Sequence, residues 1–498
     1  MTNGQPRFTA LGKLVSVLLI AGLIGLGVYM IRGGGGRVAE STESSEAGSA
    51  DAEVVDVKLE VPKLSPPAAF EFKDNIVPIE ISEYAGYAGL IAANGGLDPS
   101  ENSLFFKNHG FKVKLTVKED ENWSELNEGK MAGSVTTVDV LAAYGRQLHT
   151  VVPAQIGFSR GADGVVVRSD IKRINQLKGK TIATAQFTEV DFFIRYLAQE
   201  AGLEINALGS LDAEPHPERL NLVYTEEGFG AGDLFLNDVR SGKNRLAGCV
   251  TWEPKVSEVV EGSGGKAHVL TTNRNLLIIA DVLVLHRGFA EQQPKIVEGL
   301  VQGLLEGNRM VRERPDQHLD VVGRAFKWSR EDTKKELANV HLSNLPENRA
   351  FFSGAIDAAG SFSGIYQSAV LAYGSDLIKD PPDSSRFFDG KHLEAMEKSG
   401  LFKEQTIAIA PIRSGAASSV ETDPLLSKDI RFLFEPNSST LDMSNQENIR
   451  NLDAIKRLLQ VSPGSTLLLR GHVDNSKVSD FRRQGGEAYV RQMALRAM

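Results

Sequence analysis

Short apolar runs alternate with helix-like periodicity through the middle of the chain. Residues 165–167 and 181–184 are runs of β-branched and small residues bounded by polar turns, a pattern that predicts two strands. A helix is expected to begin at Thr188, because Asp191 stands three residues later and can complete a capping box. The apolar face of this helix, which ends before Gly202, consists of Val190, Phe193, Ile194, Leu197, Ala198 and Ala201. A strand therefore points its carboxyl end at a helix N-terminus, which is where α/β sheets bind ligands.

The same alternation continues on both sides of this stretch. Further strand-like runs lie at residues 76–81, 111–117, 222–224, 246–250 and 282–285. A helix with several apolar positions on one face begins near Pro294. Strands that alternate with helices predict an α/β fold. A chain of 498 residues is too long for one core, so we expect two or three domains with connecting segments.

The most specific stretch is GADGVVVRSDIKRINQLKGKTIAT, residues 161–184. It resembles the crossover into the second lobe of the periplasmic solute-binding proteins of ABC importers, in the class that binds nitrate, sulfonates, taurine and thiamine precursors. The resemblance extends over about residues 76–373. It implies a type II two-lobed α/β domain at 74–410, with lobe two at about 169–272. An unspecified α/β domain with a common Leu-Lys-Gly-Lys turn is the alternative.

The resemblance also implies which residues line the cleft between the lobes. The candidates follow strands or begin helices, and they are Ser82, Glu83, Tyr84, Tyr87, Thr136, Thr137, Ser159, Arg160, Gln186, Phe187, Thr188, Glu189, Gly230, Trp252, Glu253 and Arg274. The indole of Trp252 can stack on a flat solute. For the loop that begins at Ser82, ordinary packing within the lobe stays open as the alternative. The crossing segments at 165–168 and 278–285 are expected to form the hinge.

The charge of the solute stays open at this point. Arg160 and Arg274 can hold an anion. A flat cation can instead be held by a second set, which consists of Glu83, Glu189, Asp191 and Glu253 with Tyr84, Tyr87 and Trp252. Neither set is favoured by the sequence.

No catalytic chemistry is expected. Gly228, Gly230 and Gly232 match a nucleotide-binding loop only weakly, because the rest of a dinucleotide unit is missing. The nine histidines lack metal-ligand spacing, and neither a nucleophile elbow nor a phosphate loop with its lysine occurs, so we expect no metal, no cofactor and no enzyme. The net charge of −9 argues against a nucleic-acid partner. Cys249 is the single cysteine, which excludes an intrachain disulfide.

The N-terminal part contains an apolar run at residues 14–31 with basic residues on both sides. Its eighteen residues are at the lower limit for a membrane span, so we expect an uncleaved signal-anchor at 11–32, with a cleaved signal peptide as the alternative. Residues 33–73 are rich in glycine, serine, glutamate and proline, which predicts a flexible linker. The anchor implies the inner membrane as a partner and places the bulk of the chain in the periplasm.

The C-terminal part follows a small and polar linker at 411–427 and forms a second unit at 428–498. The pattern predicts a strand at 429–434, a helix at 447–460 and a strand at 466–470. This βαβ unit, with the loop Gly-His-Val-Asp-Asn that ends at Asn475, resembles the α+β OmpA-like peptidoglycan-binding domain. The resemblance implies that Asp474 and Asn475 bind peptidoglycan, with the Asp474 carboxylate accepting the ammonium group of diaminopimelate. The family's downstream arginine is not found in register, which indicates an incomplete domain.

These observations together indicate a membrane-anchored periplasmic solute receptor for an ABC-type importer, tethered to peptidoglycan and delivering its solute to a permease. A wall-linked sensory or structural protein that uses the same fold without transport is the alternative. An enzyme acting on a thiamine-like precursor ranks third, because it would need a catalytic cysteine or histidine in the cleft.

Overall fold

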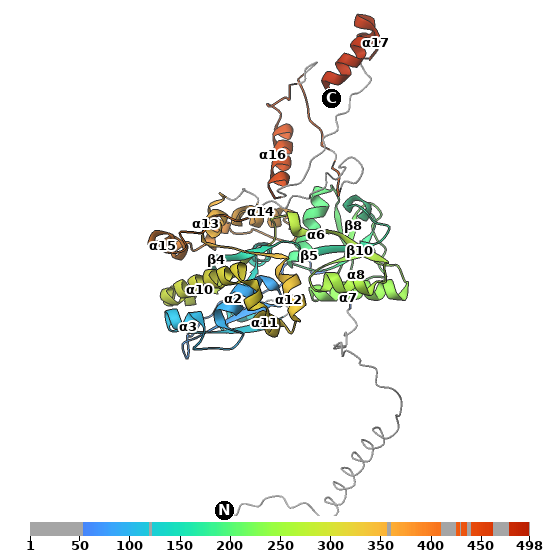
Figure 1. Cartoon of the computed structure of the whole chain (residues 1–498). Coiled ribbons are helices and arrows are strands. Elements are labelled where there is room, and N and C mark those ends of the chain that lie inside the picture. Colours follow the sequence, from blue (N-terminus) through green and yellow to red (C-terminus); the bar gives the residue numbers. More distant parts are fainter. Residues whose placement is uncertain are drawn as a thin grey trace, which may run out of the picture. The chain divides into compact units, whose positions relative to one another are not determined.

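The computed structural model describes residues 53–118, 122–355, 360–409, 425–428, 430–435, 440–461 and 478–497. Most of these residues form two α/β lobes, each built on a six-stranded sheet (Figure 1). The candidate membrane segment at 14–31 lies outside the described residues, as do Asp474 and Asn475. Among the helices of the described ranges, none combines the length and the apolar character that crossing a membrane requires.

Lobe one contains a mixed sheet with the strand order β12-β4-β11-β3-β1-β2. Its strands are β1 (Ile76–Ser82), β2 (Lys112–Lys118), β3 (Gly133–Thr137), β4 (Thr150–Ser159), β11 (Ala280–His286) and β12 (Val340–Leu342). Strands β1, β2 and β3 are parallel, whereas β11 runs antiparallel to both β3 and β4. The strand that returns from the other lobe is thus inserted in the middle of this sheet, as the predicted type II two-lobed architecture requires.

The helices of lobe one cover its sheet and continue into the C-terminal part of the domain. They are η1 (Ala85–Tyr87), α2 (Ala88–Asn94), α3 (Leu104–His109), α4 (Trp123–Asn127), α5 (Val138–Tyr144), α9 (Arg287–Gln292), α10 (Pro294–Glu313), α11 (Pro315–Phe326), α12 (Arg330–Leu337), α13 (Leu345–Ser353), α14 (Phe362–Tyr373), η4 (Ser384–Arg386) and α15 (Lys391–Ser399). The predicted helix near Pro294 is α10, whose apolar face packs against α2 and α3.

Lobe two has the strand order β10-β5-β9-β6-β8-β7. Its strands are β5 (Asp163–Arg168), β6 (Thr181–Ala185), β7 (Ile205–Ala207), β8 (Leu220–Thr225), β9 (Gly248–Trp252) and β10 (Ala267–Thr272). Its helices are η2 (Ile174–Leu177), α6 (Glu189–Glu200), α7 (Gly228–Ser241), α8 (Lys255–Gly262) and η3 (Asn273–Asn275). Strand β5 already belongs to this sheet, so lobe two begins about six residues earlier than expected, and the chain crosses between the lobes at 160–162 and 273–279.

Helix α6 begins as predicted after Thr188, but its first turn is held differently from a capping box. The Thr188 hydroxyl donates to the carbonyl of Ala185 at 2.8 Å instead of capping the helix. The Asp191 carboxylate accepts the backbone N–H of Phe187 at 3.1 Å and pairs with Arg195 at 2.8 Å. Asp191 is fully buried, so it is a structural residue of lobe two.

Helix α14 packs against α5 of lobe one and α6 of lobe two. Apolar side chains of α5, α6 and α14, among them Leu141, Phe193 and Ile365, belong to one continuous core. The Tyr373 hydroxyl at the end of α14 donates to the Thr188 carbonyl at 3.2 Å. Its ring also lies 5.1 Å from the guanidinium of Arg195, within cation–π range. The contact between the lobes is therefore apolar and well packed on this side.

The expectation of a flexible linker as far as residue 73 is wrong for residues 53–72, which we call the strap. The strap binds lobe two through a backbone hydrogen bond of 2.8 Å from Val55 to Tyr224 and through Lys58, whose N–H and C=O both bond to the Gln186 side chain. It then binds lobe one, where Phe70 is 5% exposed and packs edge-on against Phe289. The composition suggested a coil, but apolar residues spaced along the segment bury against the two lobes.

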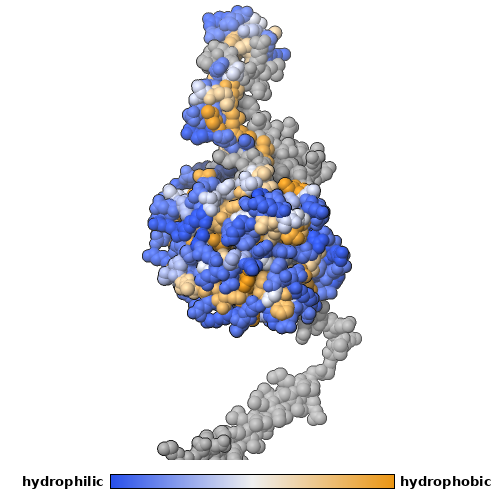
Figure 2. Space-filling model, turned by 90° about the vertical axis from the view of Figure 1, so that its left-hand side faces the viewer, coloured by the Kyte–Doolittle hydropathy of each residue, from blue (hydrophilic) through white to orange (hydrophobic). Residues whose placement is uncertain are grey.

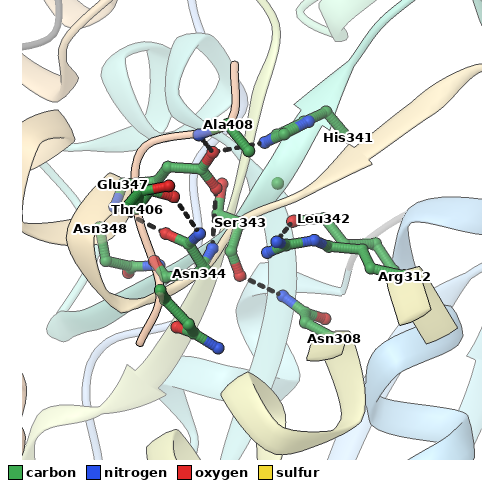
Figure 3. A network of polar contacts seen from close by, with 12 residues as sticks. Asn308, Arg312, His341, Leu342, Ser343, Asn344, Glu347, Asn348, Thr406 and Ala408 are labelled. Atoms are coloured by element: carbon green, nitrogen blue, oxygen red, sulfur yellow. Dashed lines mark hydrogen bonds and ion pairs between the residues drawn. The ribbon is translucent and has the colours of Figure 1, made fainter. Parts of the chain in front are cut away.

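On the C-terminal side, the chain is held to lobe one as far as Ala408 (Figure 3). The fully buried Glu347 carboxylate accepts the backbone N–H of Asn344 at 2.9 Å and that of Ala408 at 2.8 Å, and it contacts His341 at 3.0 Å. The Asn344 side chain donates to the Thr406 carbonyl at 2.8 Å. These bonds to the passing backbone close the two-lobed domain near its expected end.

Beyond Ala408, the described residues of the predicted linker at 411–427 and of the C-terminal unit at 428–498 differ from the structure that the sequence predicts. Ser427 exchanges two hydrogen bonds with the side chain of Asn175 in lobe two, so the end of the predicted linker lies on the domain. The predicted strand at 429–434 is reduced to a single bridge between Phe434 and Leu441. Helix α16 (Gln446–Val461) matches the predicted helix, and a further helix, α17 (Val478–Ala497), lies where no helix was predicted.

The C-terminal unit carries apolar side chains on its surface. In Figure 2 hydrophobic residues gather in the uppermost part of the view, which is this unit. Those at least about two-fifths exposed are Leu433, Phe434, Met443 and Leu459. The visible face of the two-lobed body is mostly hydrophilic, with smaller apolar areas between.

Candidate functional site

A small cavity lies where the two lobes meet. Its volume is about 30 Å³, which is room for roughly two water molecules. Both lobes contribute to its wall, as does Ile279 of the second crossing segment. The lining residues are Ser82, Tyr84, Tyr87, Thr137, Ser159, Asp163, Glu189, Trp252, Ile279 and Asp281. The residues come from the carboxyl ends of β1, β3, β4 and β9, from the first turns of η1 and α6, and from the starts of β5 and β11. This is the edge at which α/β sheets bind ligands.

Asp163 anchors the crossing segments at the cavity. Its carboxylate accepts a short hydrogen bond from the Ser159 hydroxyl and a bond of 2.8 Å from the Asn273 amide. The Asn273 carbonyl oxygen in turn accepts the N–H of Gly161 at 2.8 Å, which ties one crossing segment to the other. Burial raises the pKa of Asp163 to about 6, although the hydrogen bonds to its carboxylate partly offset this rise. The hydrogen bonds from Ser159 and Asn273 hold the carboxylate in one orientation.

On the lobe-one side, two tyrosines, Tyr84 and Tyr87, line the cavity. The Tyr87 hydroxyl donates to Asp281 at 3.0 Å, and the rings of Tyr84 and Tyr87 meet edge to face at 5.4 Å. Burial, together with the charges of Asp281 and Asp163, raises the pKa of Tyr84 well above its usual value, so its phenol stays neutral. Gly86 makes room for this arrangement, because a Cβ there would lie 2.2 Å from the Tyr84 ring.

On the lobe-two side, Trp252 forms the wall at the end of β9. It is 8% exposed, and its ring centroid lies 4.9 Å from that of Phe229. A Cβ at Gly228 would lie 1.9 Å from the indole, so the glycine-rich start of α7 is the surface on which Trp252 rests. This packing gives the glycine-rich loop a structural role that the weak nucleotide-binding match did not suggest.

Thr137, the N-cap residue of α5, contributes a hydroxyl to the cavity wall. The side chain is 6% exposed, and its hydroxyl has no hydrogen-bond partner among the described residues. A buried hydroxyl without a partner costs free energy, typically ~1–3 kcal/mol, so such groups are uncommon in a protein interior. Its place in the cavity wall makes it a natural contact for a ligand.

The structure brings several predicted site residues together at the cavity. These are Ser82, Tyr84, Tyr87, Thr137, Ser159, Glu189 and Trp252. The remaining candidates, Glu83, Thr136, Arg160, Gln186, Phe187, Thr188, Gly230, Glu253 and Arg274, do not line it. Their assignment as ligand residues stays a prediction, but the structure gives several of them other partners.

Four of these side chains make contacts within the domain. The Glu83 carboxylate accepts the indole N–H of Trp328 at 2.7 Å. Gln186 binds the strap, as described above, and Phe187 is buried between Tyr144 and Tyr373. Glu253 accepts both the backbone N–H and the hydroxyl of Ser257, and thereby holds the first turn of α8.

Sequence reasoning missed Asp163, Ile279 and Asp281. Asp281 had a usable signal, because it is the one acidic residue in the apolar run 278–285 that was expected to cross between the lobes. An acidic residue inside a buried strand needs a partner or a function. Asp163 stands in the quoted motif of residues 161–184, but its position in that motif alone did not show that it turns toward the cleft.

The charges around the cavity are all negative. Asp163, Glu189 and Asp281 are among its lining residues, and lysine, arginine and histidine are not. Arg160 lies on the crossing segment, where its Nε donates to the Arg274 carbonyl at 3.4 Å. Burial and the neighbouring charge of Arg274 lower the pKa of Arg160. In the described part of the chain, no three acidic, histidine or cysteine side chains are grouped so as to hold a metal ion.

No protein-family model matches the sequence, and no curated protein matches it. Solved structures of similar fold include a component of an ABC-type import system and two periplasmic binding proteins. The ligand-binding component of an ABC-type import system from Staphylococcus aureus is 14% identical, covers 64% of this chain and 98% of its own, and has a TM-score of 0.45.

Two further solved structures are similar to the same extent. The periplasmic aliphatic sulphonate-binding protein SsuA from Escherichia coli is 16% identical, covers 63% of this chain and 92% of its own, and has a TM-score of 0.46. The periplasmic nitrate-binding protein NrtA from Synechocystis PCC 6803 is 13% identical, covers 67% of this chain and 90% of its own, and also has a TM-score of 0.46. All these scores are below 0.5, so the two-lobed fold rests on the strand orders and crossing segments given above.

Proposed function

We propose that the chain is a solute-binding receptor of an ABC-type importer, which captures a small solute between its two lobes and presents it to a permease. The observation that supports this proposal is the cavity whose wall is shared by both lobes and lies beside the segments that cross between them. Rotation of the lobes about residues 160–162 and 273–279 would open and close this cavity, as in other hinged binding domains. A ligand that contacts both lobes binds the closed arrangement more tightly than the open one and therefore stabilises the closed arrangement.

The proposal includes the two attachments that the sequence predicts. The apolar run at 14–31 would anchor the chain in the inner membrane, with the two lobes in the periplasm. The OmpA-like pattern that contains Asp474 and Asn475 would bind peptidoglycan. The apolar run and the loop with Asp474 and Asn475 both lie outside the described residues. A receptor held at both ends would stay near its permease.

The test of this proposal measures the distance between the lobes in the full chain with and without solute. Exposed Lys107 in lobe one and Lys243 in lobe two are each replaced by cysteine and labelled for distance measurement by electron resonance. The native Cys249 is buried, and burial raises its thiol pKa, so the label goes to the introduced thiols. Without solute, we expect the distances between the two labels to be longer or more broadly distributed. With solute, we expect one narrow distribution at a shorter distance.

One observation favours the alternative of a sensory or structural protein without transport. The strap and helix α14 each contact both lobes, and these contacts oppose a wide opening. If the lobes are fixed, the same labels give one narrow distribution under all conditions. That result, combined with no binding of any solute, would exclude the receptor.

A further inference from the structure

The solute class can be argued from the cavity, and this step rests on the proposed function. Three carboxylates from different elements reach the same small space: Asp163 from the start of β5, Glu189 from the first turn of α6 and Asp281 from β11. Lining residues of opposite charge are absent from the described cavity wall. Buried charges of one sign repel one another, and a bound charge of the opposite sign relieves that repulsion.

The rest of the wall suits the same kind of ligand. Tyr84, Tyr87 and Trp252 present aromatic surfaces on two sides, and aromatic faces attract cations electrostatically. The hydroxyl of Thr137 adds an independent observation, because it is buried at the cavity without a partner in the described chain and can accept a hydrogen bond. A ligand with N–H donors would give this hydroxyl a partner and would add charge-assisted bonds to the carboxylates, which already accept bonds from the protein.

The features that would favour an anion are occupied or lie elsewhere. The N-terminus of α6 is an end of positive polarity, but Glu189 in its first turn already supplies the complementary charge. The backbone N–H of Phe187, just before this helix, is bonded to Asp191. Arg160 and Arg274 are held at the crossing segment and do not line the cavity.

We propose that the solute is a small organic cation with N–H donors, such as a primary ammonium or a guanidinium group, bound by Asp163, Glu189 and Asp281 between aromatic walls. The cation would donate charge-assisted hydrogen bonds to the carboxylates, which are about twice as strong as those between neutral groups. A primary ammonium head is about the size of one of the two water molecules for which the cavity has room, and the rest of a larger cation would extend between the lobes.

The experiment compares ligands of equal shape and different charge. Guanidinium, urea and nitrate are planar and of similar size but carry positive, zero and negative charge; ethylammonium and ethanesulfonate form a second pair. Binding of each at millimolar concentration to the full chain in mild detergent is measured by calorimetry and by tryptophan fluorescence, to which Trp252 in the cavity wall contributes. We expect binding of the two cations and at least about tenfold weaker binding of urea, nitrate and ethanesulfonate.

Two variants connect the result to the cavity. Glu189→Gln keeps the shape of a half-buried side chain and should lower cation affinity at least about tenfold, whereas Glu291→Gln on the exposed face of α9 is the matched control and should change nothing. Thr137→Val should weaken cation binding while slightly stabilising the ligand-free protein, since it removes a buried hydroxyl without a partner. A purely structural threonine would show the opposite effect on stability.

The outcomes separate this inference from the proposed function. Binding of nitrate or ethanesulfonate with closure of the lobes would overturn the cation and leave the receptor intact. Binding of no compound of any charge, with no small molecule released from freshly purified protein on denaturation, would overturn both. An organic cation identified by mass spectrometry among the released molecules would support the inference, and a released anion would contradict it.

Discussion

Phe70 in the strap offers a sharp test of whether residues 53–72 belong to the two-lobed domain. Its side chain is 5% exposed, packs edge-on against Phe289 and belongs to the lobe-one core. Truncation of a buried phenylalanine to alanine typically costs ~3–5 kcal/mol, through lost transfer free energy and the cavity that remains. Because the strap can detach locally from the domain, we expect the lower end of that range, ~3 kcal/mol, for Phe70→Ala.

The assay is urea unfolding of the full chain followed by tryptophan fluorescence. The three tryptophans, Trp123, Trp252 and Trp328, all lie in the two-lobed part, so the transition reports on that part of the chain. Leu59→Ala is the matched control, since Leu59 belongs to the same strap but is 81% exposed, and it should shift the transition by less than ~0.5 kcal/mol. Equal, small shifts for both variants would show that the strap is a linker after all and that its packing adds nothing to stability.

Three further predictions concern other parts of the chain. Burial and the nearby charge of Glu253 raise the pKa of Glu336 in the folded protein to about 7. The stability that this raised pKa contributes is fully present below the pKa of the unfolded chain, near 4.5, and is lost as the pH rises through 7. Glu336→Gln should therefore flatten the decline in unfolding free energy between pH 5 and pH 8, and an unchanged decline would contradict this. Asn344→Ala removes the hydrogen bond to Thr406 and the cap of α13, which should lower the unfolding free energy by ~1–2 kcal/mol and speed proteolysis near residues 405–409. A proteolysis rate equal to that of the unchanged protein would show that the network does not hold this segment. In a form of the protein with a complete OmpA-like domain, Asp474→Ala should abolish pull-down by peptidoglycan, and wall binding that persists in this variant would place the contact elsewhere.

The local patterns along the chain were sufficient to predict the class of fold. Runs such as 181–184 with an amphipathic helix after them specify a strand and a helix, because their periodicity matches only one secondary structure. The resemblance carried by residues 161–184 implied the two lobes that the structure contains. The expected hinge was wrong, because 165–168 and most of 278–285 are strands inside the two sheets and the chain crosses at 160–162 and 273–279 instead. Helix α6 also begins where the sequence places it, although a different set of hydrogen bonds holds its first turn.

What the sequence could not show is which side chains meet across the lobes. The charge of the solute stayed open because Arg160, Arg274 and the acidic residues are all near expected strand ends, and periodicity cannot tell which of them turn toward the cleft. The structure places Asp163, Glu189 and Asp281 together and leaves the arginines outside. Likewise, the strap is polar and proline-rich in sequence, and its few apolar residues gain stability only where the two lobes offer them a surface. Contacts between residues such as Lys58 and Gln186, 128 positions apart, depend on the assembled fold, because no local pattern records a partner at that distance.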